Sequence, residues 1–178
     1  EIHFKQTRTN RAFLTEEELG ILLQKEFTIP RLQTVRDIFV FCALTGLAFT
    51  DVQHLRHDHI IKDGNGEYWI RKAREKTDNM CDIPLLDIPR MILEKYKGHP
   101  ECMKKGVLLP VPSNQRMNSY LKEIADTCGI TKPLSTHVAR HTFATVALAN
   151  RVSMESVAKM LGHTDIRTTR IYARILDK

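Results

Sequence analysis

Residues 135–145 read Ser-Thr-His-Val-Ala-Arg-His-Thr-Phe-Ala-Thr, and this stretch predicts a capped helix that begins near Thr136 and runs to residue 150. His137 and Arg140 lie three positions apart, so both project from one face of its first turn. The amino end of a helix adds a positive potential and free backbone amides. Together these groups indicate a phosphate site, because the planar arginine fork can hold two oxygens at once. A surface arginine beside a structural histidine is the alternative that so short a pattern leaves open.

The segment that follows strengthens the phosphate interpretation. After Leu161-Gly162-His163-Thr164 comes a predicted helix over residues 166–177, which carries Tyr172 among arginines at positions 167, 170 and 174. A phenol is mostly protonated at neutral pH and is then a poor nucleophile, but nearby cations favour the phenolate, which can attack phosphorus. The alternative is an amphipathic helix that packs its tyrosine on the core.

Hydrophobic spacing in the rest of the chain indicates a mainly α fold with a small antiparallel β-sheet, an α+β class. Further helices are predicted at 15–26, at 31–44, after a Thr50 cap, and at 89–97, 114–128 and 154–161. Short strands are predicted around residues 60–61, 68–70 and 83–85, with the turn Asp63-Gly64-Asn65-Gly66 between the first two.

Length and composition restrict the class of protein. The chain has 178 residues, which suits one domain, and 42% of them are hydrophobic, which supplies a core. No apolar run is long enough to span a membrane. The net charge is +6, and ten basic against five acidic residues lie in 116–178, which raises the chance of a polyanionic partner. Four cysteines without a CxxC pair suit reduced thiols, so we expect a cytoplasmic protein.

Five short motifs occur in an order that resembles a known family. They are Thr45-Gly46-Leu47 followed by Asp51, Lys76 ahead of Ile83-Pro84-Leu85, His137-x-x-Arg140-His141, Leu161-Gly162-His163, and Tyr172. In this order, and on helices and strands of the expected type, they resemble the catalytic domain of tyrosine recombinases, the integrases of phages and other mobile elements. The resemblance spans about residues 13–176.

The resemblance implies cutting and rejoining of double-stranded DNA without a metal or another cofactor. Tyr172 would attack the scissile phosphate to form a 3′-phosphotyrosyl link, with Arg140, His137 and His163 around its oxygens. Lys76 would protonate the departing 5′ oxygen. Residues 1–13 would be a linker from a missing N-terminal DNA-binding domain, and residues 14–178 the catalytic domain. The full-length protein would act as a homotetramer on two duplexes.

The sequence departs from the family at one position. The family places its first catalytic arginine directly after Thr-Gly-Leu, where this chain has Ala48. A methyl group cannot hold a phosphate oxygen, so either activity is impaired or another arginine replaces the missing one. Arg74 is the first candidate, because residues two apart on a strand point to one side and it would then lie with Lys76. Arg36 is the second candidate, and Asp51 would orient Arg140.

Three other functions stay open on the sequence alone. A catalytically impaired DNA-binding module would keep the fold and the basic face. A type IB topoisomerase-like enzyme would use similar chemistry, although Leu161-Gly162-His163 favours a recombinase. A metal site at His54, His57 and His59 lacks a further ligand at the spacing typical of zinc sites.

Overall fold

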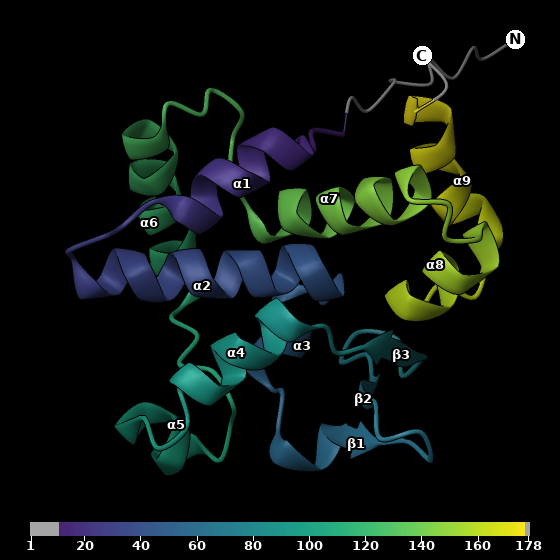
Figure 1. The fold of residues 1–178 in the computed structure, drawn as a ribbon, viewed down its shortest axis with the longest axis horizontal. Coiled ribbons are helices and arrows are strands. Elements are labelled where there is room, and N and C mark those ends of the chain that lie inside the picture. Colours follow the sequence, from purple (N-terminus) through teal and green to yellow (C-terminus); the bar gives the residue numbers. More distant parts are fainter. Residues whose placement is uncertain (1–10, 177–178) are drawn as a thin grey trace, which may run out of the picture.

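The computed structural model describes residues 11–176, which form nine α-helices, a short 3₁₀ helix and three strands (Figure 1). The α-helices are α1 (Glu16–Gln24), α2 (Pro30–Thr45), α3 (Phe49–Gln53), α4 (Asp87–Lys95), α5 (Pro100–Lys105), α6 (Asn114–Cys128), α7 (Thr136–Ala149), α8 (Met154–Leu161) and α9 (Ile166–Leu176). The 3₁₀ helix η1 covers His57–His59, and the strands are β1 (Ile60–Lys62), β2 (Tyr68–Ala73) and β3 (Met80–Pro84). The predicted α+β class is confirmed.

Helices α2 and α7 lie side by side at the centre of the molecule, and the other elements surround them (Figure 1). Helix α1 packs on α2 from one side, whereas α4 and the sheet lie on the other. Helices α8 and α9 pack on one another beside α7, and α8 also contacts β3. The carboxyl end of α2, the sheet, α7 and α8 therefore meet in one region.

Local sequence signals explain most element boundaries. Thr15 and Glu18 form the predicted capping box at α1, with backbone-to-side-chain hydrogen bonds of 3.0 and 3.1 Å. The side chain of Ser135 caps α7. Helices α2, α6 and α8 each end at a glycine with positive φ, and this conformation is the one that favours glycine at a helix end.

The structure differs from the prediction most clearly at α3 and α5. Helix α3 is capped by Ala48 rather than Thr50, and Ala48 makes no side-chain cap bond. Helix α5 was absent from the prediction, because only Cys102 of its six residues is buried and so short a segment has no readable period. The end predicted for the last helix, residue 177, lies outside the described residues, as do residues 1–10 of the predicted linker.

The sheet has the order β1-β2-β3, and both pairs are antiparallel. Ile60 pairs with Ile70, and Ile70 pairs with Ile83, so their side chains share the buried face. Lys72 also points to this buried face of the sheet and is only 3% exposed. Strand β2 therefore carries a charged side chain into the protein just before the turn to β3.

The buried side chains form two clusters. The larger cluster surrounds α2, and the smaller one consists of Phe143, Ala144, Val157, Leu161 and Tyr172. All four cysteines are free thiols, and burial raises the pKa of Cys42 to about 12 and that of Cys81 to about 11. Within the described part of the chain, no helix is long and apolar enough to cross a bilayer.

Candidate active site

Arg140 is the fixed centre of the site. It lies on the second turn of α7 and is 8% exposed. Its Nη1 donates to the carbonyl of Gly46 at 2.6 Å, and its Nη2 donates to the carbonyl of Leu161 at 2.7 Å. A guanidinium carries five N–H donors, so these two bonds leave donors for a ligand. The left-handed turns at Gly46 and Gly162 direct the two carbonyl groups toward α7, which holds the guanidinium in place.

The positive charge of Arg140 is not paired with a carboxylate among residues 11–176. Burial, followed by the nearby positive charge of Arg74, lowers the pKa of Arg140 to about 10. At neutral pH the group therefore stays charged. Two neighbouring guanidinium groups, one of them buried, can together stabilise a bound anion.

Arg74 reaches Arg140 from the turn between β2 and β3. Its Nε lies 3.5 Å from Oδ2 of Asp51, a long contact that leaves most of the guanidinium free of a tight partner. The side chain crosses Gly162, where an added Cβ would lie only 2.7 Å from Cδ of Arg74. Since Gly162 follows Leu161 directly, Arg74 passes beside the residue whose carbonyl holds Arg140.

The turn that carries Arg74 is tied to the domain at two points. Oδ1 of Asp51 accepts a hydrogen bond of 2.8 Å from the backbone N–H of Glu75. At the other side, the side-chain amide of Asn79 donates to the carbonyl of Gly162 at 3.1 Å. The turn therefore bridges α3 and the end of α8, which fixes where Arg74 enters the site.

Asp51, which was predicted to orient Arg140, is a buried carboxylate that contacts other groups. It is 1% exposed and contacts Arg74, the N–H of Glu75 and Nζ of Lys72 at 3.7 Å. Arg140 is held by carbonyl groups instead. Asp51 thus positions the β2–β3 turn, and no described hydrogen bond joins it to Arg140.

His163 follows Gly162 and lies in the same positive region. Its Nδ1 is 2.9 Å from Oγ1 of Thr169, which is fully buried on α9. Burial, with the positive charges of Arg140, Arg74 and Arg11, lowers the pKa of His163 to about 4. His163 is therefore neutral at pH 7, and it can supply a hydrogen bond but no net charge to the site.

Tyr172 lies on α9 with its side chain only 3% exposed. Its ring centroid is 5.5 Å from that of His141, and its hydroxyl accepts a hydrogen bond of 3.3 Å from Nη1 of Arg11. The phenol also lies close enough to Arg140 for the two groups to interact electrostatically. The phenol thus faces the same cluster as the arginines, although the smaller apolar cluster surrounds its ring.

His137 lies on the first turn of α7, and Lys76 lies in the turn between β2 and β3. Both side chains are exposed, and the centroid of the His137 ring is 6.5 Å from that of His141. Arg140 is buried whereas His137 is exposed, so the two side chains do not share the buried face of α7. Lys76 lies two residues after Arg74 in the β2–β3 turn, and within the described chain no hydrogen bond or ion pair engages its ammonium group.

Arg74 and Lys76 were expected to point to one side of an extended strand, and this expectation is wrong. Strand β2 ends at Ala73, so the alternation of a strand does not apply to residues 74 and 76. The backbone N–H of Arg74 bonds the carbonyl of Asn79, and that of Asp78 bonds the carbonyl of Arg74. The two side chains diverge in this turn, with Arg74 directed inward and Lys76 exposed.

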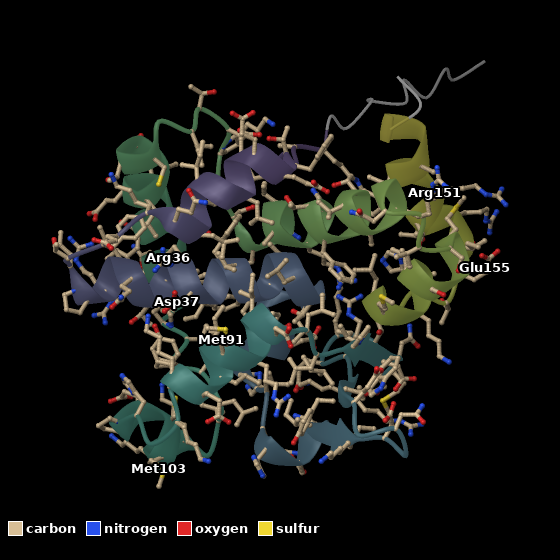
Figure 2. The ribbon with its side chains drawn as sticks, viewed as in Figure 1. Arg36, Asp37, Met91, Met103, Arg151 and Glu155 are labelled. Carbon is tan, nitrogen blue, oxygen red and sulfur yellow. The ribbon has the colours of Figure 1, made fainter. Side chains whose placement is uncertain are left out.

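Arg36, the second candidate for the missing arginine, is not brought to the site. Its Nη1 donates to the carbonyls of Leu22 and Lys25, and its Nε pairs with Asp37 at 2.9 Å. Figure 2 shows Arg36 on the part of α2 beneath α1, far across the molecule from α8 and α9. Its guanidinium joins the end of α1 to α2, which is a structural role.

The three histidines considered for a metal site do not converge. Nδ1 of His54 is 2.8 Å from the carbonyl of Thr50, and Nδ1 of His59 accepts from the N–H of Arg56 at 2.9 Å. Nowhere among residues 11–176 do three His, Cys, Asp or Glu side chains gather as metal ligands would.

The fold and the motifs agree with a family model described as the phage integrase family, which matches residues 12–178. The chain belongs to the phage integrase family. The predicted resemblance is therefore confirmed.

Relatives of this chain include bacterial tyrosine recombinases and a phage integrase. The tyrosine recombinase XerD of Listeria monocytogenes is 49% identical over 142 residues, which cover 74% of this chain and 46% of XerD. The integrase of Escherichia phage P2 is 25% identical, covering 95% of this chain and 44% of the integrase. The chain spans about half the length of these curated relatives.

Solved structures show the same fold. The XerH site-specific recombinase in a post-cleavage complex with its difH substrate matches with a TM-score of 0.75 and 20% identity, over 93% of this chain and 50% of XerH. A dimer of lambda integrase residues 75–356 bound to a COC′ core site matches with a TM-score of 0.67 and 18% identity, over 94% and 60% of the two chains. This integrase-family chain therefore has the recombinase catalytic-domain fold.

Lys72 and Arg11 contact residues of the candidate active site but were not predicted to belong to it. Lys72 is buried, and its Nζ lies 2.9 Å from Glu75 and 3.7 Å from Asp51. Its inward position follows from the alternation of side chains along β2, since Lys72 lies two residues after the buried Ile70. Arg11 contacts Tyr172 across 161 positions, and no local pattern marks such a contact.

Proposed function

We propose that this domain is the catalytic part of a site-specific recombinase, which cleaves and rejoins double-stranded DNA through a 3′-phosphotyrosyl intermediate. The observation that carries the proposal is the buried, unpaired charge of Arg140 beside Arg74, with Tyr172 and His163 turned toward the same place. This arrangement fits a phosphodiester, whose negative oxygens would replace the missing counter-charge.

Arg140 and Arg74 would bind the non-bridging oxygens of the scissile phosphate. Arg74 would thereby fill the place that Ala48 leaves empty, because it enters between α3 and the end of α8 and has only a long contact with Asp51. A bound phosphate would also raise the pKa of His163 from its value of about 4, since an anion stabilises the imidazolium.

The reaction would move one bond and one proton. The phenol oxygen of Tyr172 attacks phosphorus, and the bond from phosphorus to the 5′ oxygen breaks. Lys76 donates a proton to that oxygen, and solvent takes the phenol proton and restores the proton of Lys76. The exposed ammonium of Lys76 would reach the DNA from the β2–β3 turn, and His137 from the first turn of α7. Attack by the freed 5′-hydroxyl reverses the step and rejoins the strand.

The assembly of the whole protein belongs to the proposal as well. The full-length protein would act as a homotetramer on two DNA duplexes, with a DNA-binding domain upstream of residue 14 completing a clamp. The free thiols suit a cytoplasmic setting, where DNA of a mobile element would be the substrate.

Covalent trapping tests this function. The probe is a pool of short nicked duplexes with randomised sequence around the nick, in which loss of a small fragment prevents rejoining. We expect an adduct that survives denaturant, and we expect Tyr172→Phe to abolish it. Salt-sensitive DNA binding without any adduct would instead support the impaired DNA-binding module. Relaxation of supercoiled plasmid by a monomer, without strand exchange, would support the topoisomerase alternative.

A further inference from the structure

The segment just before α1 is docked onto α7 rather than leading away from the domain. The carbonyl of Ala12 accepts a hydrogen bond of 3.2 Å from Nδ1 of His141, and the N–H of Leu14 donates to Oγ1 of Thr142 at 2.9 Å. Between them, the carbonyl of Phe13 accepts from Nζ of Lys132 at 3.0 Å. Three consecutive residues are therefore fixed by polar contacts, and the side chain of Leu14 is fully buried.

This docking places Arg11 on the candidate nucleophile. Nη1 of Arg11 donates to the phenol oxygen of Tyr172 at 3.3 Å, and its guanidinium carbon lies 5.8 Å from the centroid of the Tyr172 ring. The neighbouring Ala12 contacts His141, whose ring lies 5.5 Å from that of Tyr172. Arg11, His141 and Tyr172 thus form a contiguous group on the side of α7 that faces α9.

Arg11 differs from Arg74 and Arg140 in what it touches. Arg140 bonds two carbonyl groups beside Gly46 and Gly162, and Arg74 crosses Gly162, whereas Arg11 contacts the phenol oxygen itself. A hydrogen bond from a cation strengthens as its acceptor becomes negative. The contact therefore stabilises the phenol oxygen most when it has lost its proton, which is the state that attacks phosphorus.

We propose that Arg11 is a catalytic residue that stabilises the attacking oxygen of Tyr172, and that the docked segment of residues 11–14 completes the active site. The inference rests on the proposed function, because it takes Tyr172 as the nucleophile. Arg11 acts at the oxygen that forms the new bond to phosphorus, while solvent takes the phenol proton as in the scheme above. The 5′ oxygen still leaves with a proton from Lys76.

The test compares charge-retaining and neutral variants of Arg11 in single-turnover formation of the covalent adduct. The substrate is a defined nicked duplex recovered from the trapping pool. We expect Arg11→Ala and Arg11→Gln to slow adduct formation about tenfold to a hundredfold, the range for loss of a charge-assisted hydrogen bond. Arg11→Lys should retain more of the rate than Arg11→Gln. Arg31→Ala is the control, because Arg31 forms a surface ion pair with Glu123 away from the site.

A second substrate tests whether Arg11 acts on the phenol oxygen of Tyr172 or on an oxygen of the phosphate. A methylphosphonate at the scissile position replaces one negative non-bridging oxygen by a neutral methyl group. It should restore much of the rate lost by Arg74→Ala and leave the Arg11→Gln defect in place. Restoration of Arg11→Gln by the methylphosphonate would overturn the inference, because Arg11 would then act on the phosphate.

The outcomes also distinguish this inference from the proposed function. If the wild-type protein forms no adduct, or if Tyr172→Phe forms it equally well, the proposed function fails. If the adduct forms on Tyr172 and Arg11→Gln forms it at the wild-type rate or faster, only the role of Arg11 fails. Thermal unfolding of each variant checks that it is folded. If Arg11→Ala does not fold, the comparison of Arg11→Lys with Arg11→Gln still provides the test.

Discussion

Replacing Arg74 should remove most of the activity of this domain without unfolding it. The side chain is 15% exposed, and the one ion pair that it forms within residues 11–176, with Asp51, is 3.5 Å long. Loss of one donor that stabilises charge in a transition state costs about 10²- to 10³-fold in rate, or about 2.7–4 kcal/mol. We expect a loss of this size for Arg74→Ala, because position 48 is an alanine and supplies no second guanidinium to bind the phosphate.

Two companion variants separate charge from packing. The stem of Arg74 lies against Gly162, where an added Cβ would be 3.1 Å from its Cγ. Arg74→Met keeps an apolar stem of similar length and should be as slow as Arg74→Ala, since the lost group is the guanidinium. Arg71→Ala is the matched control, because Arg71 lies on β2, is 58% exposed and, in the described part of the chain, pairs with Asp82 alone. It should retain the wild-type rate.

The assay is the single-turnover rate of covalent adduct formation on the nicked duplex, with denaturant melts to confirm that each variant folds. The methylphosphonate duplex provides the second arm, in which Arg74→Ala should approach the wild-type rate. A wild-type rate for Arg74→Ala on the ordinary phosphate would refute the reasoning. It would show that the missing arginine is not replaced from the β2–β3 turn.

Two further predictions concern stability and pH. Asp51→Asn should lower the free energy of unfolding by about 3 kcal/mol, because it leaves the buried Lys72 with a single carboxylate among the described residues, that of the partly exposed Glu75. Urea unfolding measures this loss, and a loss no larger than that of the control Asp82→Asn, whose carboxylate pairs with the exposed Arg71, would contradict it. His163 has a pKa of about 4 in the folded state against about 6.5 in an unfolded chain, so the unfolded state binds more protons between these values. Its contribution to stability is full above pH 6.5 and falls by about 2–3 kcal/mol as pH drops to 4, allowing for its partial exposure. The unfolding free energy of His163→Gln should therefore depend less on pH over this window, and parallel curves for the two proteins would count against the assignment.

Much of the fold is predictable from sequence where local chemistry sets the element. The prediction of helices over residues 114–128 and 154–161 is confirmed to the residue, because Ser113, Gly129 and Gly162 supply start and stop signals within the chain itself. The three strands are found from short apolar runs and the turn Asp63-Gly64-Asn65-Gly66, but β2 and β3 extend further into the turn between them than the pattern indicated. Helix α5 has too few buried residues to show a period.

The site is predictable only as a set of residue types. The motifs identify Arg140, His163 and Tyr172, but the carbonyls that hold Arg140 come from residues 94 and 21 positions away. The partner of Asp51 depends on how the β2–β3 turn packs against α3, and the contact of Arg11 with Tyr172 depends on where the chain crosses α7. Such contacts are set by tertiary packing, and no spacing within a single segment encodes them.

A structure of the Tyr172→Phe protein bound to the nicked duplex tests the central claim most directly. The account predicts that the scissile phosphate lies within hydrogen-bond distance, about 3 Å, of both Arg74 and Arg140, with the ring at position 172 facing the phosphorus. A phosphate held by Arg140 while Arg74 stays on Asp51, or DNA bound on another face of the domain, would contradict it.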